Sequence, residues 1–227
     1  MDLTERPKFE RDFAAKLNSL SREQFAEWKR LAGSPPDPRR VPITFWQKVQ
    51  KEIDEQAAAI ILLIVAASIR SHSKPLLPWI SQEPTKQNAI SQAQEIGKQW
   101  AQQKAQQLAS EVVKNSIDRL ASVAPDAVET AAESVFGSDR VEKIAVTTTS
   151  DVIVRGGEIT IQQTVGQSED DTWYTEEDSK VCPICRPLHR QSRSTWSRFF
   201  PEGPPAHPHC RCWIEYAHEK TPALLRI

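Results

Sequence analysis

The sequence predicts a mainly α-helical protein, in which an elongated helical N-terminal part precedes a small α+β C-terminal domain. Apolar residues recur at three- and four-residue steps through most of residues 8–155, a spacing typical of amphipathic helices. From residue 173 onward this periodicity ends, and prolines and aromatic residues become frequent. All four cysteines lie in that last segment, between residues 182 and 212. We therefore expect two parts of different character.

The domain organisation follows from the same change in composition. A chain of 227 residues suits one large domain or two small ones. We predict a helical region over residues 1–137 and a C-terminal domain over residues 138–227, within which residues 173–216 form a compact knob. The acidic stretch 168–171 separates the last helix from that knob.

The helical region begins with two predicted helices. The first covers residues 8–31, and Ser21 with Gln24 has the pattern of a capping box that restarts a helix. A segment rich in glycine and proline, residues 33–38, ends this helix. The second helix is expected over residues 44–69.

Composition and charge argue against a secreted or membrane-spanning protein. The N-terminus lacks the apolar core and the small-residue cleavage site of a secretory signal. The most apolar run, residues 57–69, is shorter than the roughly 20 residues that span a bilayer. We expect it to be buried in the protein's own core or against another subunit. The formal net charge of −1 does not mark the whole chain as a binder of polyanions.

Three further helices are predicted after a proline-rich loop at residues 74–84. They are expected over residues 84–120, over residues 125–137 with Pro125 in the first turn, and over residues 138–155. Gly156 and Gly157 are expected to stop the last of these helices. The alternating residues 158–165 fit either a helix or a strand.

Cysteine and histidine residues form two turns with the same spacing, Cys182-Pro-Ile-Cys185 and His207-Pro-His-Cys210. Two donors separated by two residues can point at one ion from a tight turn, and the proline in second place restricts φ there. Each turn resembles half of a tetrahedral zinc site, which needs four nitrogen or sulfur ligands. We predict one structural zinc ion bound by Cys182, Cys185, His207 and Cys210, with Cys212 as the rival for the fourth position and His209 and His189 as weaker rivals.

Other states of the cysteines stay open at this point, namely two disulfides or four reduced thiols. Clustered pairs in a chain without a secretion signal favour metal. A structural ion is favoured over a catalytic one, because good donors are at least as many as the positions and no His-Glu-x-x-His is present. We expect four aromatic residues to pack around the ion: Trp196, Phe199, Phe200 and Trp213. Asp151 and Glu158 are interpreted as surface residues.

The C-terminal pattern resembles the signature of phage head-morphogenesis proteins of the Mu F-like type. The residues that carry the resemblance are Trp173, Asp178, Val181-Cys-Pro-Ile-Cys185, Leu188 and the string Pro204-Pro-x-His-Pro-x-Cys-Arg-Cys212. Residues 140–162 are similar to a helix of that family, and the resemblance covers residues 138–216 in all. The family's glutamate in that helix is replaced by Thr148 or Thr149, and His189 stands where a small residue is usual.

The resemblance implies a minor head protein of a tailed phage, a structural protein rather than an enzyme. Such a protein acts in head assembly and in DNA packaging or ejection. It would contact the portal protein or the major capsid protein, with packaged DNA as a further partner, and could form an oligomer on the portal ring. It would be assembled in the host cytoplasm and remain in the virion, in the head interior near the portal, without a membrane in the mature particle.

Two other functions are weighed against this interpretation. The first is a zinc-ribbon-like nucleic-acid-binding module, in which arginines contact phosphates and Trp196 stacks on a base. Its candidate arginines are Arg186, Arg190, Arg193, Arg198 and Arg211. The second is a zinc-dependent hydrolase or nuclease, in which a change at His207 would abolish turnover without unfolding the domain.

Overall fold

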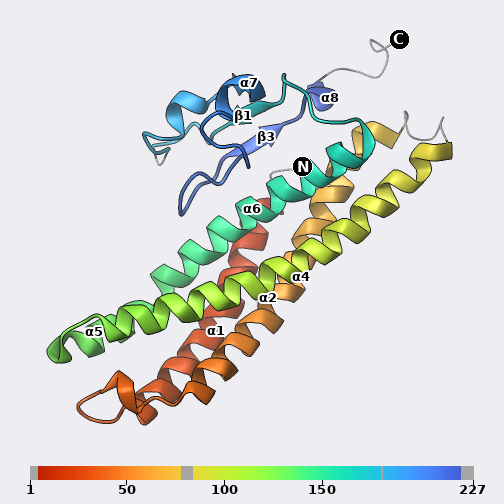
Figure 1. Cartoon of the computed structure of the whole chain (residues 1–227). Helices are drawn as coiled ribbons and strands as arrows, with labels where there is room; N and C mark the ends of the chain where they lie inside the picture. Colours follow the sequence, from red (N-terminus) through yellow and green to blue (C-terminus); the bar gives the residue numbers. More distant parts are fainter. Residues whose placement is uncertain (1–4, 78–83, 180, 221–227) are drawn as a thin grey trace.

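The protein is a bundle of long helices with a small β-containing domain packed on one side (Figure 1). The computed structural model describes residues 5–77, 84–179 and 181–220. The bundle is built from α1 (Arg6–Ala32), α2 (Ile43–Ser73), α4 (Pro84–Ala121) and α6 (Ser138–Thr164), which pack against one another. The mainly α fold with a small C-terminal sheet is as predicted.

Short elements join the long helices and make up the small domain. In the bundle they are η2 (Pro38–Arg40), η3 (Lys74–Leu76), η4 (Pro125–Ala127) and α5 (Val128–Phe136). In the C-terminal domain they are β1 (Thr172–Tyr174), η5 (Arg186–Leu188), β2 (Gln191–Ser192), α7 (Arg193–Trp196), β3 (Trp213–Glu215) and α8 (Ala217–Lys220). The three strands form an antiparallel sheet in the order β2-β1-β3, in which Trp173 is paired with Gln191 on one side and Ile214 on the other.

Helix α1 runs without interruption through Ser21, so the predicted restart there is wrong. Ser21 is buried, and its hydroxyl donates 2.8 Å to the carbonyl of Phe136 at the end of α5 instead of capping α1. The helix ends where glycine was expected to end it. Gly33 has a φ of 81° and its amide donates to the carbonyl of Lys29.

The apolar run in α2 is buried mainly in the protein's own core. Ile61, Ile64 and Ile69 are fully buried between the helices of the bundle, whereas Leu62 and Leu63 are exposed. Among the described residues, no helix combines the length and the apolarity that crossing a membrane requires.

Helix α6 continues to Thr164, so the expectation that Gly156 and Gly157 stop it is wrong. The two glycines serve close packing instead. A Cβ on Gly156 would lie 2.6 Å from Cβ of Ser68 in α2, and one on Gly157 would lie 2.7 Å from the ring of Tyr216 after β3. Both contacts are shorter than side chains allow, so only glycine lets α2 and the C-terminal domain approach α6 this closely.

Replacement of Gly156 by alanine should destabilise the protein by about 1–3 kcal/mol, in spite of alanine's higher helix propensity. The Cβ of Ser68 is fixed to the backbone of α2, so the two helices must move apart. Gly97→Ala is the comparison variant, because the atom nearest to its new Cβ is Cδ1 of Ile69 at 2.7 Å, the end of a side chain that can rotate, with Cγ1 of Val65 next at 3.0 Å. Urea unfolding measures both variants, and equal stabilities for the two would contradict this account.

The C-terminal domain shares its core with α6. Val154 and Ile161 of α6 and Leu76 of η3 pack against the small domain. The residues that they meet include Trp173, Cys185, Leu188, Trp196, Cys210, Cys212, Ile214 and Tyr216. The first half of α6 lies in the bundle core through Val141 and Ala145. Helix α6 therefore belongs to both parts, and the small domain packs along the second half of this helix.

A candidate metal centre in the C-terminal domain

The first ligand turn is Cys182-Pro-Ile-Cys185, directly before η5. The amide of Cys185 donates to the sulfur of Cys182 at 3.3 Å, and the amide of Arg186 donates to the carbonyl of Cys182 at 3.0 Å. These bonds close the turn and bring both sulfur atoms to its inner side. Cys185 is almost fully buried and Cys182 is half-buried, whereas Ile184 between them is exposed.

The second ligand turn runs from His207 to Cys212. The amide of Cys210 donates to the carbonyl of His207 at 3.1 Å, and His209 takes a left-handed φ of 62°. Nδ1 of His207 lies 2.7 Å from the carbonyl of Pro208. A carbonyl only accepts, so Nδ1 is the donor in this bond, and in a neutral imidazole this leaves Nε2 as the nitrogen that can bind a metal.

The two turns converge, as the sequence predicted, and bring five donor atoms together. Nε2 of His207 lies 2.8 Å from Sγ of Cys182 and 3.2 Å from Sγ of Cys185. Sγ of Cys185 lies 3.8 Å from Sγ of Cys210. The donors form two groups that share Cys185, each with its atoms within 4.8 Å of one another: Cys182, Cys185 and His207, and Cys185, Cys210 and Cys212.

The donor set fits a soft divalent cation. In a tetrahedral site with metal–sulfur bonds of about 2.3 Å, neighbouring sulfurs are about 3.8 Å apart, and Cys185 and Cys210 have this separation. All four cysteines are free thiols in the structure, as such a site requires. Both Cys210 and Cys212 are buried beside Cys185, so both are placed to supply the fourth ligand.

The thiols influence one another's ionisation. Hydrogen bonds with Cys185 and then Cys212 lower the pKa of Cys210, while the hydrogen bond with Cys210 raises the pKa of Cys185. Closely packed thiolates repel each other, so one ionised thiol makes ionisation of the next less favourable. A bound divalent cation would supply the positive charge that lets several of them ionise together.

The two weaker ligand candidates lie outside the metal centre, and only part of the expected aromatic shell packs near it. Nδ1 of His189 lies 3.2 Å from the amide nitrogen of Thr175, and His209 is exposed, so neither belongs to the two donor groups. Trp196 and Phe200 pack in the core that contains the cysteines. Phe199 is 69% exposed, and therefore does not shield the centre as expected.

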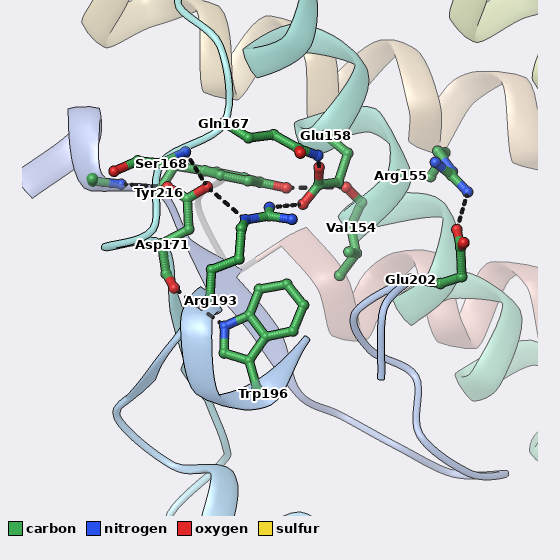
Figure 2. A network of polar contacts seen from close by, with 11 residues as sticks. Val154, Arg155, Glu158, Gln167, Ser168, Asp171, Arg193, Trp196, Glu202 and Tyr216 are labelled. Atoms are coloured by element: carbon green, nitrogen blue, oxygen red, sulfur yellow. Dashed lines mark hydrogen bonds and ion pairs between the residues drawn. The ribbon is translucent and has the colours of Figure 1, made fainter. Parts of the chain in front are cut away.

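A buried ion network joins the C-terminal domain to α6, and sequence reasoning missed it (Figure 2). Arg193 in α7 donates 2.6 Å to Glu158 of α6 and 3.2 Å to Asp171 before β1. All three side chains are buried, so the interpretation of Glu158 as a surface residue is wrong. The sequence did contain a sign of this burial, because Glu158 lies on the same helical stripe as the apolar Val154 and Ile161.

Asp171 organises the network by accepting bonds from the backbone as well. The amide of Ser168 donates to Oδ2 at 3.1 Å, and the amide of Ala217 donates to Oδ1 at 3.0 Å. The backbone carbonyl of Asp171 accepts from Nε1 of Trp196 at 3.2 Å, and the guanidinium of Arg193 lies 4.8 Å above the same indole ring. One buried carboxylate thus joins the segments before β1, at α7 and after β3.

The five arginines considered for nucleic-acid contact lie in different surroundings. Arg186, Arg190 and Arg198 are exposed, Arg211 is half-buried and Arg193 is buried. Arg211 binds both carboxylate oxygens of Asp178 at 2.7 Å. Arg193 serves the ion network and Trp196 is fully buried, so neither is placed to contact a phosphate or stack on a base.

Comparisons with family models, with curated proteins and with solved structures gave no match to this chain.

Proposed function

We propose that this chain is a minor head protein of a tailed phage, in which a structural zinc ion holds the C-terminal domain together. The supporting observation is the convergence of Cys182-Pro-Ile-Cys185 with the His207–Cys212 turn in one buried cluster. These are the residues on which the resemblance to head-morphogenesis proteins rests. Motif residues that lie close together in the structure support the family resemblance more strongly than the same motif in the sequence alone.

Zinc is the proposed ion because of the chemistry of the donors. Thiolate sulfur and imidazole nitrogen suit zinc, which accepts tetrahedral sets of four such ligands. Cytoplasmic assembly, which the proposal includes, keeps thiols reduced and available for metal. The strands of this domain have only two or three residues, so they stabilise it little. The free energy of metal binding would add to the stability of the folded domain.

A structural role is proposed for the ion, and no catalytic residue is assigned. Five donors compete for four positions, so no position is left for a substrate or a water molecule. Cys185, Cys210 and Cys212 are each at most 4% exposed, which keeps substrates away from that side of the ion, whereas Cys182 and His207 are half-buried. The zinc-dependent hydrolase is therefore the less favoured alternative.

In this proposal the helical bundle makes the contact with the portal protein or the major capsid protein. The exposed Leu62 and Leu63 on α2 are apolar side chains that such a contact could cover. The protein would lie in the head interior near the portal, and would act through placement in assembly and in DNA packaging or ejection.

The test is to look for the chain in particles of the phage that encodes it. Gradient-purified heads should contain a few copies of the chain by quantitative mass spectrometry. Deletion of its gene should give particles that either contain no DNA or fail to eject it. A charge on the exposed face of α2, Leu63→Asp, should keep the chain out of particles, whereas Ile184→Ala, an exposed position in the first ligand turn, should enter normally. A chain that is absent from both procapsids and mature heads would overturn the proposal.

A further inference from the structure

We propose that Arg6, at the start of the first helix, positions the second ligand turn and so couples metal binding to the docking of that helix. This inference rests on the metal centre of the proposed function. It is independent of the role in a phage head.

Arg6 is a buried side chain that contacts the backbone of the ligand turn. It is 4% exposed, although it stands in the first turn of α1. Its Nη1 donates 2.7 Å to the carbonyl of Arg211, and its Nη2 lies 3.4 Å from the carbonyl of Cys210. The guanidinium therefore reaches the proposed fourth ligand, Cys210, and the single residue that separates it from its rival, Cys212.

Helix α6 also supports this turn. The hydroxyl of Ser150 bonds to the carbonyl of Cys210 and accepts 2.7 Å from Nη2 of Arg6. The amide of His209 donates 2.9 Å to the hydroxyl of Thr147. Three consecutive residues of the turn, 209–211, are thus fixed through their backbone by side chains of the bundle.

These contacts bear on metal binding through geometry and charge. A ligand that is already oriented loses less conformational freedom when the ion binds, and outer contacts of this kind commonly change metal affinity about 10–100-fold. A divalent ion with three thiolates and one imidazole carries a net negative charge. The guanidinium of Arg6 lies beside that charge in a buried place, with Glu10 at 2.8 Å as its carboxylate partner.

The coupling has a reciprocal consequence. If docking of the first turn of α1 raises metal affinity, metal binding must stabilise that docking by the same factor. Loss of the ion should therefore loosen residues 6–10 of α1 while the rest of the bundle, which has its own cores, stays folded. In this arrangement, the docking of the first turns of α1 depends on whether the ion is bound.

The test compares the Zn²⁺ affinity of full-length variants by competition with a chromophoric chelator. Arg6→Gln should bind Zn²⁺ about tenfold more weakly or worse. Arg11→Gln, an exposed arginine on the same helix, should bind like the wild type. Arg6→Lys should be intermediate, because an ammonium group lacks the fork that bonds two acceptors at once. Co²⁺ spectra of the variants report whether the ligand set itself has changed.

Hydrogen exchange gives the second readout. Chelation should speed exchange in the first turns of α1 in the wild type, and Arg6→Gln should show fast exchange there even with Zn²⁺ bound. Should Arg6→Gln fail to fold, Ser150→Ala removes the other donor to Cys210 without removing a charge, and should weaken Zn²⁺ binding.

The outcomes separate this inference from the metal centre on which it rests. A wild-type chain that binds no Zn²⁺ would overturn both. Wild-type affinity in Arg6→Gln and in Ser150→Ala, together with lost binding in Cys185→Ser, would overturn the role of Arg6 and leave the metal centre standing.

Discussion

Replacement of Cys185 by serine should abolish metal binding and unfold the C-terminal domain, while most of the helix content remains. Cys185 is the residue that joins the two donor groups and is 2% exposed, so its loss leaves two separate donor pairs, Cys182 with His207 and Cys210 with Cys212. Structural zinc sites supply on the order of 10 kcal/mol to the folding of small domains. The long helices have two apolar cores of their own and should keep their circular dichroism signal.

The measurements are metal content by elemental analysis, far-UV circular dichroism for the bundle, and tryptophan fluorescence for the small domain. Trp173 and Trp196 are fully buried in that domain, so their emission should shift to the red on unfolding. Ile184→Ala changes the same turn at an exposed side chain and should leave all three signals unchanged. A helix signal that disappears with the metal would show that the two parts fold as one unit.

Removal of the ion by a chelator should reproduce the variant without any mutation. Wild-type protein should release about one zinc ion per chain, and the four cysteines, all free in the structure, should then react with a thiol reagent. A chain with neither metal nor reactive thiols would instead contain disulfides. In that case the thiolate centre would be wrong, and with it the proposed basis of folding.

The features that the sequence predicted well are those encoded by local spacing. The long helices follow from apolar residues at helical steps, and the Cys/His turns follow from paired donors two residues apart. Convergence of the turns was expected because each turn alone offers only half of a ligand set. Local patterns of this kind need no knowledge of which elements touch.

The errors arose where tertiary contacts decide the role of a residue. Gly156 and Gly157 look like a helix stop in sequence, but the helix continues through them. They are glycines because Ser68 and Tyr216 come too close for a side chain. Ser21 has the letters of a cap, yet its hydroxyl binds α5. Glu158 is ionisable, and charged residues are usually exposed; it is buried only because Arg193, 35 positions later, is buried with it.

Arg193→Gln should be the most destabilising change outside the metal ligands. The substitution leaves Glu158 and Asp171 as two buried carboxylates without a cation, and removal of one partner from a buried ion pair costs about 3–5 kcal/mol. It also removes the guanidinium that lies over the ring of Trp196. Urea unfolding followed by tryptophan fluorescence measures the loss, with Arg198→Gln as the exposed control in the same segment.

A second pair of variants separates charge from shape in this network. Glu158→Gln should cost less than Arg193→Gln, because the amide oxygen can still accept from Arg193 and Asp171 still balances its charge. The double variant Arg193→Met with Glu158→Leu should recover part of the loss, since apolar side chains of similar size can replace a buried pair. If Arg193→Gln is as stable as Arg198→Gln, the network does not hold the domain on α6.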